Sequence, residues 1–136
     1  MDNLYRENIL DHYKNPRNFG KLQNPSASLK LYNSACGDEI EMQIQFRIHP
    51  PAGGSKFIID DIRFSGQGCA ISIASASMLT EKVKGKTIEK IQNLTTKDIL
   101  KMLGVSLSPS RLKCAILPLE VLQKTAALAK EKENKV

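Results

Sequence analysis

The sequence contains no tryptophan, and aromatic residues make up only 5% of its 136 residues. Hydrophobic residues still reach 41%, near the average for globular proteins, so we expect an aliphatic core. No run of about 18 apolar residues occurs, and we therefore expect no membrane-spanning helix. Charges interrupt residues 1–8 and no apolar segment follows them, so we expect no secretory signal and a cytoplasmic location.

Two signatures of nucleotide and nucleic-acid binding are also missing. The chain has no GxxxxGK pattern, which excludes the common phosphate-binding loop. The net charge is +6, but the basic residues are spread along the chain without an accompanying basic-aromatic motif. Nucleic acid is thus an unlikely partner. The densest basic stretch, residues 82–90, is explained as a solvated helix end and turn, or as a docking surface for an acidic protein.

Cysteine is scarce as well. The three cysteines, Cys36, Cys69 and Cys114, form no CxxC pair and are 33 and 45 residues apart. An odd number of cysteines in a chain without an export signal favours reduced thiols over a disulfide framework. Their chemistry is then burial, metal binding or reactivity.

Hydrophobic periodicity predicts one helix followed by three strands. Apolar residues at helical spacing indicate a helix over residues 4–13, which ends before Asn15-Pro16. Alternating apolar and polar residues indicate strands at 29–32, 39–48 and 57–64, with a Pro/Gly turn at 50–55 between the last two. The strands form an antiparallel meander in which one face is buried and the other is exposed to solvent.

Helices fill the rest of the chain. A helical pattern follows Cys69 and stops near Gly85, and its small residues at 72 and 74–77 indicate close helix packing. Thr87 and Thr95 are expected to cap two short helices, at 88–91 and 97–103. A loop at 106–110 precedes a last helix over 114–131, since Pro118 is tolerated only near a helix start. We therefore predict a single α+β domain, residues 1–136, with a small antiparallel three-stranded sheet, helices packed on one face, and mobile ends.

Every cysteine falls at a boundary between predicted elements. Cys69 follows Gly66 and Gly68 where a strand meets a helix, and the N-terminus of a helix favours thiolate. Taken alone, Cys69 is better explained as a small buried hydrophobic side chain. Cys36 lies two residues before Asp38, between two strands, and Cys114 lies between a loop and a helix start. The side chains can therefore converge.

Three thiolates and one carboxylate supply the four ligands that tetrahedral zinc or cluster iron needs. A set that mixes soft sulfur with one harder oxygen should hold a soft metal less firmly than four cysteines, which suits a site that releases its metal. Arg111 and Lys113 would stabilise thiolate or cluster charge, or they are solvated loop residues. His12 and His49 neighbour no cysteine, so we assign them packing or surface roles.

The motifs resemble those of the U-type iron-sulfur cluster assembly scaffold family, the IscU, SufU and NifU N-terminal group. The resemblance covers nearly the whole chain and rests on YRENILDHYKNPRN at 5–18, Cys36-Gly37-Asp38, residues 66–78 around Cys69, and Arg111-Leu112-Lys113-Cys114. It implies an IscU/SufE-like fold, with Cys36, Asp38, Cys69 and Cys114 as ligands.

The resemblance also implies a function in sulfur and cluster transfer. A cysteine desulfurase would deliver sulfur as a persulfide, and Cys114, the family's mobile terminal cysteine, is the first candidate acceptor. The leading hypothesis is a scaffold that binds Fe²⁺ or a [2Fe-2S] cluster and passes the cluster to acceptor apo-proteins. This is a binding and transfer role, in which no catalytic turnover need belong to this chain alone.

Two departures from the family keep an alternative open. Lys113 stands where the housekeeping scaffold branch has a histidine and favours a zinc-dependent sulfur relay of the SufU kind, with Zn²⁺ on the same four residues. The 45-residue spacing lacks the SufU insertion, which argues against that relay. A structural zinc protein with an interaction surface is the third hypothesis. The chaperone-binding stretch of the scaffold branch matches residues 107–111 only in one leucine and one proline, so we do not count a dedicated chaperone among the partners.

Overall fold

The protein is described by a computed structural model over residues 3–34, 37–49 and 56–134. The chain begins with helix α1 (Asn3–Lys14), followed by strands β1 (Ala27–Asn33), β2 (Asp38–His49) and β3 (Lys56–Gln67). Four helices complete it: α2 (Ala70–Val83), α3 (Ile88–Gln92), α4 (Thr96–Leu103) and α5 (Pro109–Asn134). The predicted turn at 50–55 lies outside the described residues, as do residues 1–2 and 135–136, which belong to the ends predicted to be mobile.

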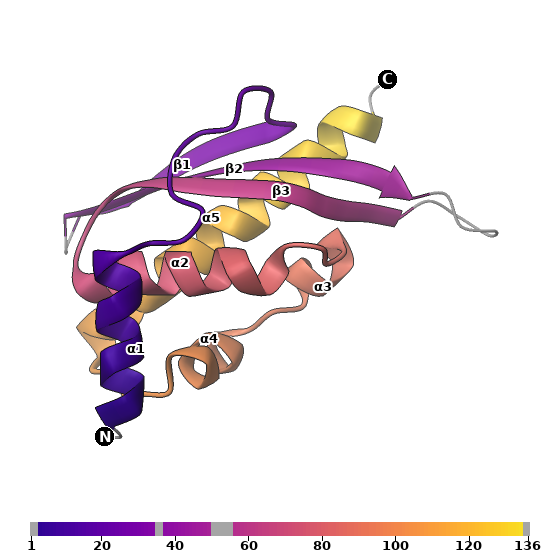
Figure 1. Ribbon diagram of the computed structural model, residues 1–136. Helices are drawn as coiled ribbons and strands as arrows, with labels where there is room; N and C mark the ends of the chain where they lie inside the picture. Colours follow the sequence, from indigo (N-terminus) through magenta and orange to yellow (C-terminus); the bar gives the residue numbers. More distant parts are fainter. Residues whose placement is uncertain (1–2, 35–36, 50–55, 135–136) are drawn as a thin grey trace.

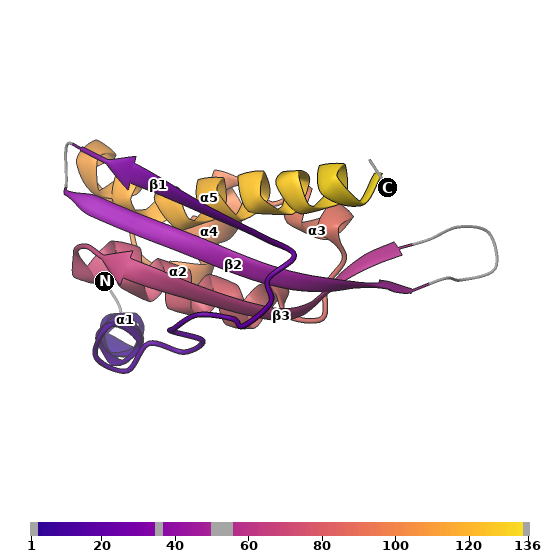
Figure 2. The same ribbon diagram turned by 90° about the horizontal axis from the view of Figure 1, so that it is seen from above.

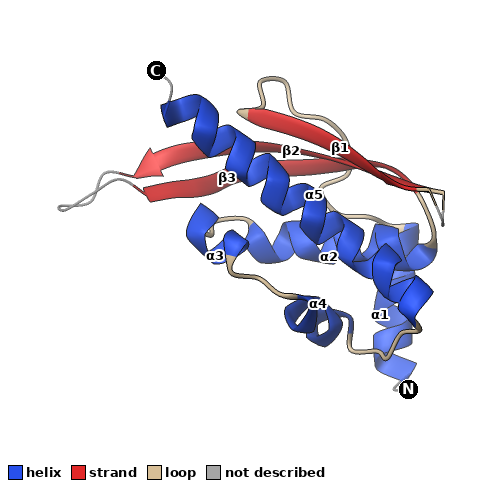
Figure 3. Ribbon diagram, turned by 180° about the vertical axis from the view of Figure 1, so that it is seen from behind, coloured by secondary structure: helices blue, strands red, loops and turns tan. Residues whose placement is uncertain are grey.

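The three strands form one antiparallel sheet in the order β1-β2-β3. The helices pack on one face of it, with α5 under β1 and β2 and α2 under β3 (Figure 1). Viewed from above, α1 lies outside the edge of the sheet, next to α2 (Figure 2). Seen from behind, α5 crosses the sheet diagonally and α4 forms an outer layer (Figure 3). The predicted fold class is confirmed. None of the described helices has the length and hydropathy that a membrane span requires.

The alternating pattern of β2 places its apolar side chains in the core. Ile40, Met42 and Ile44 are fully buried against the helices, and the polar residues between them face outward. The strands are longer than the sequence predicts, because β3 continues pairing with β2 as far as Gln67. This extension brings the end of β3 next to the start of β2, and so fixes where α2 begins.

A bulge changes the alternation in β3. Gln45 pairs with Asp61 but Phe46 pairs with Ile59, which leaves Asp60 as an extra residue. Because of this extra residue, both Ile59 and Ile62 point into the core although they are three positions apart.

The short helices α3 and α4 begin and end within one residue of the bounds predicted from the sequence. The side chain of Thr87 accepts a hydrogen bond from the backbone N–H of Lys90, and Thr95 forms a capping box with Asp98. Gly104 ends α4 in the left-handed conformation, with φ of 72°. These local signals act within a few residues, which is why the sequence alone locates them.

The prediction for the last helix is wrong at its start. Helix α5 begins at Pro109, not near Cys114, and continues through Pro118. Proline suits the first turn of a helix, so Pro109 is a good start, whereas Pro118 costs one backbone hydrogen bond. Burial compensates for this cost, because Ala115, Leu117, Leu119 and Val121 are all buried. Cys114 therefore lies inside the helix and not at its boundary.

Candidate metal centre

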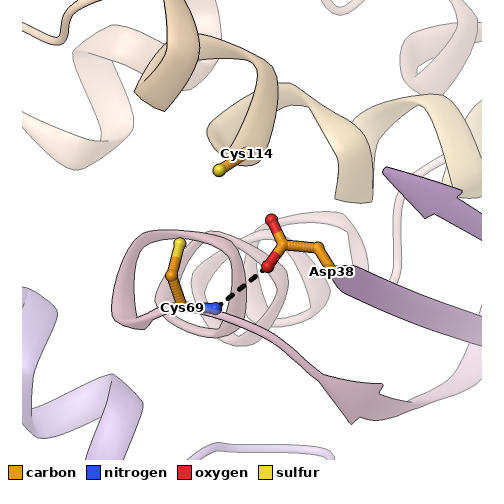
Figure 4. Close-up of side chains that lie close together, drawn as sticks. All are labelled: Asp38, Cys69 and Cys114. Atoms are coloured by element: carbon orange, nitrogen blue, oxygen red, sulfur yellow. Dashed lines mark hydrogen bonds between the residues drawn. The ribbon is translucent and has the colours of Figure 1, made fainter. Parts of the chain in front are cut away.

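Three of the four predicted ligands come together. Asp38, Cys69 and Cys114 each offer one ligand atom, and these atoms lie within 4.8 Å of one another. Figure 4 shows the carboxylate of the first residue of β2, the thiol just before α2 and the thiol in the second turn of α5 pointing into one space. The fourth predicted ligand, Cys36, lies outside the described residues, two positions before Asp38 in the chain.

The backbone of Cys69 fixes the Asp38 carboxylate. Cys69 is the N-cap residue of α2, and its N–H donates a hydrogen bond of 3.0 Å to Oδ1 of Asp38. A carboxylate that accepts from an N–H at the start of a helix also benefits from the helix dipole. The strand pairing of β2 with β3 thus places the aspartate directly at the N-terminus of α2.

Two glycines make this close approach possible. Gly66 has φ of 137°, and a Cβ atom there would overlap the carbonyl of Glu39 on the paired strand. A Cβ atom on Gly68 would lie 2.6 Å from Oδ1 of Asp38 and would also overlap Oγ of Ser72. Both positions therefore require glycine, in agreement with the tight turn predicted from the sequence.

The other carboxylate oxygen is the most informative atom of the site. Asp38 is only 1% exposed, and its Oδ2 has no hydrogen-bond partner in the described part of the chain. A buried carboxylate oxygen without a partner is costly, and such an atom calls for an explanation. A cation held between Oδ2 and the two sulfurs would supply the missing interaction, and a set of sulfur and oxygen ligands fits zinc or iron.

The two thiols differ in their accessibility. Cys69 is partly exposed, and its Sγ is 3.9 Å from Oγ of Ser72. Cys114 is only 2% exposed, and its Sγ donates to the backbone carbonyl of Ser110 over 3.6 Å. A reagent from outside therefore reaches Cys69 more easily than Cys114.

The predicted supporting residues lie beside the site and not within it. Arg111 and Lys113 are both exposed. Arg111 lines a groove of about 300 Å³ together with Arg6, and residues of α1, α2 and the 105–107 segment provide its apolar walls. Because the groove reaches Ala70, next to Cys69, these two arginines place positive charge near the rim of the site.

His12 has the packing role that the sequence predicts. It is buried between α1 and α2, with Nδ1 2.7 Å from Oγ of Ser77 and Nε2 3.8 Å from Glu81. Burial lowers the pKa of His12, and the positive charge of Arg17 lowers this pKa further. The side chain of His49 lies outside the described residues.

Sequence reasoning missed the contribution of two serines, Ser72 and Ser75. The sequence indicates only close helix packing for both, and both are fully buried. Ser72 also donates to the carbonyl of Cys69 over 3.1 Å, and Ser75 donates to the carbonyl of Ala115 over 2.7 Å. A serine three residues after a helix N-cap could have signalled the first contact. Nothing in the sequence indicates the second contact, because it joins residues 40 positions apart.

Comparison with known proteins identifies the family of this chain. Residues 4–136 match the family described as the NifU-like N-terminal domain. The chain belongs to this family. Among its relatives, the zinc-dependent sulfurtransferase SufU of Bacillus subtilis is 38% identical, with 93% of this chain and 92% of that protein aligned. The iron-sulfur cluster assembly scaffold protein IscU of Aquifex aeolicus is 43% identical over 87% of this chain and 71% of that protein.

A solved structure extends the similarity to the fold of the NifU-like N-terminal domain family. The SUF-system protein FiSufU of Fervidobacterium islandicum AW-1 superimposes with a TM-score of 0.68 at 27% identity. The superposition covers 88% of this chain and 94% of that one. The relatives thus include both a scaffold and a zinc-dependent sulfurtransferase.

Proposed function

We propose that this protein is an iron-sulfur cluster assembly scaffold. It accepts sulfur from a cysteine desulfurase, binds iron or a [2Fe-2S] cluster through Cys36, Asp38, Cys69 and Cys114, and transfers the cluster to acceptor proteins. The observation that carries the proposal is the buried carboxylate of Asp38, which lies within 4.8 Å of two thiols and whose Oδ2 has no hydrogen-bond partner among the described residues. Membership of a family that contains named scaffolds supports it.

Sulfur transfer follows from thiolate chemistry. The Cys114 thiolate attacks the terminal sulfur of the desulfurase persulfide, a new S–S bond forms on Cys114, and the desulfurase cysteine leaves as thiolate. Two electrons from an external reductant then convert the transferred sulfur to sulfide and restore the Cys114 thiolate. Asp38 and Cys69 hold iron during these steps.

Asp38 makes the site suitable for release. Iron in a cluster is held most firmly by thiolates, and a carboxylate oxygen is a harder ligand than sulfur. One oxygen among the four ligands therefore weakens retention. A scaffold needs this property because its product must leave.

A zinc-dependent sulfur relay is the second candidate function. Lys113 favours it, as does the 38% identity with a zinc-dependent sulfurtransferase over most of both chains. In this mechanism the same four residues would hold Zn²⁺, and Cys114 would become free to attack once a ligand from the sulfur donor replaced it. The two functions share the site and differ in the metal that it carries.

Anaerobic reconstitution distinguishes them. The protein is incubated with ferrous iron, cysteine and a cysteine desulfurase, and visible absorption, iron and sulfide are measured. A scaffold should show two-iron cluster bands with iron and sulfide in equal amounts, and Cys114→Ser should lose them. Thr125→Val is the matched control, because it removes a fully buried hydroxyl from the same helix farther along the chain.

Each alternative gives a different result. A relay should retain zinc, form no cluster, and accelerate the desulfurase in a manner that depends on Cys114. A structural zinc protein should neither exchange its metal nor activate any desulfurase, and Asp38→Ala should unfold it. Either of these results would overturn the scaffold proposal.

A further inference from the structure

The buried position of Cys114 raises the question of what holds this thiol at the site. Its neighbour Ala115 accepts a hydrogen bond of 2.7 Å from the hydroxyl of Ser75. Both Ser75 and Ala115 are 0% exposed. The bond joins α5 to α2, one residue after Cys114 and six residues after Cys69. It therefore ties together the two helices that bring the thiols to the site.

Pro118 gives this bond particular weight. In a regular helix the carbonyl of residue 114 accepts a hydrogen bond from the N–H of residue 118, and proline has no N–H. The backbone of α5 is thus weakened between the segment 109–117, which contains Cys114, and the rest of the helix. Contacts with other elements must then hold the segment 109–117 in place, and the Ser75 hydroxyl provides one of them.

We propose that Ser75 is a positioning residue for Cys114. Its hydroxyl holds the segment 109–117 so that the Cys114 thiol faces Asp38 and Cys69, and loss of this hydrogen bond lets the segment turn outward and exposes the thiol. The hold of Ser75 on the segment 109–117 concerns only the geometry of this chain. The use of the exposed thiol rests on the proposed function, in which a sulfur donor must reach Cys114.

Thr125 provides a matched control for Ser75. Both hydroxyls are fully buried and both donate to a backbone carbonyl. The hydroxyl of Thr125 donates to Val121 within α5, so it links no second helix. Removing it should cost stability without changing the relative position of α2 and α5.

The first test measures thiol reactivity in the metal-free protein. Wild type, Ser75→Ala and Thr125→Val are treated with iodoacetamide, and the alkylation rates of Cys114 and Cys69 are followed by peptide mass spectrometry. Loss of one buried hydrogen bond shifts a local opening equilibrium by about tenfold, so Ser75→Ala should raise the Cys114-to-Cys69 rate ratio about tenfold. Thr125→Val should leave the ratio unchanged. An unchanged ratio in folded Ser75→Ala would overturn the proposal.

A second variant covers the case in which Ser75→Ala does not fold. Pro118→Ala restores a backbone N–H that can donate to the carbonyl of residue 114, and it should slow the alkylation of Cys114. It should also reduce the effect of Ser75→Ala in the double variant, because the two changes act on the same segment. A Cys114 rate at or above that of wild type in Pro118→Ala would count against the proposal.

Cobalt binding separates this proposal from the proposed function. The proteins are titrated with Co²⁺, and the sulfur-to-cobalt charge-transfer absorption is recorded. Ser75→Ala should bind Co²⁺ about tenfold more weakly with a weaker charge-transfer band. If wild type gives no such band but Ser75→Ala still exposes Cys114, the positioning role stands and the metal proposal fails. If wild type binds Co²⁺ normally and Ser75→Ala changes neither affinity nor spectrum nor reactivity, the positioning role fails alone.

Discussion

Replacing Asp38 by asparagine should stabilise the metal-free protein and weaken its metal binding. Asparagine has nearly the same shape as aspartate and keeps an oxygen that can accept from the N–H of Cys69, 3.0 Å away in wild type. It removes the negative charge that is buried in wild type with one oxygen lacking a partner among the described residues. The variant therefore keeps the shape, removes the charge and places an amide NH2 group where Oδ2 lies, from which it can donate weakly to the neighbouring sulfurs.

The expected size follows from opposing contributions. Making the hydrogen bond neutral costs about 1 kcal/mol, because bonds to charged acceptors are roughly twice as strong as neutral ones. Loss of the interaction with the α2 dipole costs about 0.3–1 kcal/mol. Burying an ionised carboxylate costs several kcal/mol in real proteins, and asparagine avoids this cost. The net gain in the free energy of unfolding should be about 1–3 kcal/mol for the metal-free variant.

Urea denaturation provides the assay. Wild type and Asp38→Asn are compared with a chelator and a reductant, and again with excess Zn²⁺. The order of stability should reverse when zinc is added, because metal binding stabilises wild type by mass action and the variant has lost an anionic ligand. A metal-free variant less stable than wild type would show that the Asp38 carboxylate is satisfied without metal, and would refute the reasoning from its Oδ2 atom.

Three further predictions concern other parts of the molecule. Burial lowers the pKa of His12, so the unfolded chain binds more protons than the folded one. The free energy of unfolding should therefore decrease as pH falls below about 6.5. His12→Asn should make this pH dependence weaker in urea titrations at several pH values. Gly68→Ala should lower the melting temperature, because the added Cβ would displace the Asp38 carboxylate. It should also weaken Co²⁺ binding at least about tenfold, since disturbing the position of a metal ligand lowers metal affinity roughly 10–100-fold. Thr95→Ala should remove the cap of α4 and cost about 1 kcal/mol in the free energy of unfolding, while the cobalt spectrum stays as in wild type.

Each of these predictions has an outcome that contradicts it. If the free energy of unfolding depends on pH equally in wild type and His12→Asn, groups other than His12 cause the dependence. Normal cobalt affinity in Gly68→Ala would mean that the turn can shift without moving Asp38. A changed cobalt spectrum in Thr95→Ala would show that loss of the α4 cap reaches the metal site through α2 and α5, against which α4 packs.

The sequence predicts the sheet and most helices because their signals are local. Alternation in β2 indicates a strand with one buried face, and threonine and glycine caps indicate the ends of α3 and α4. The start of α5 is missed because Pro118, taken locally, argues against a helix that begins well before Cys114, although Pro109 is a favourable first residue of a helix. Only the burial of both sides of Pro118 in the tertiary structure offsets its cost.

The sequence by itself determined which residues are candidate ligands, because cysteine and aspartate are recognisable from their ligand chemistry, although Cys114 proved to lie inside α5 and not at its boundary. It could not determine that Asp38, Cys69 and Cys114 meet, since their spacing along the chain says nothing about distance in space. The pairing of β2 with β3 and the packing of α5 against α2 decided this. The tertiary structure alone showed the unpartnered Oδ2 of Asp38 within the described residues and the bond from Ser75 to Ala115, because both depend on contacts between distant segments.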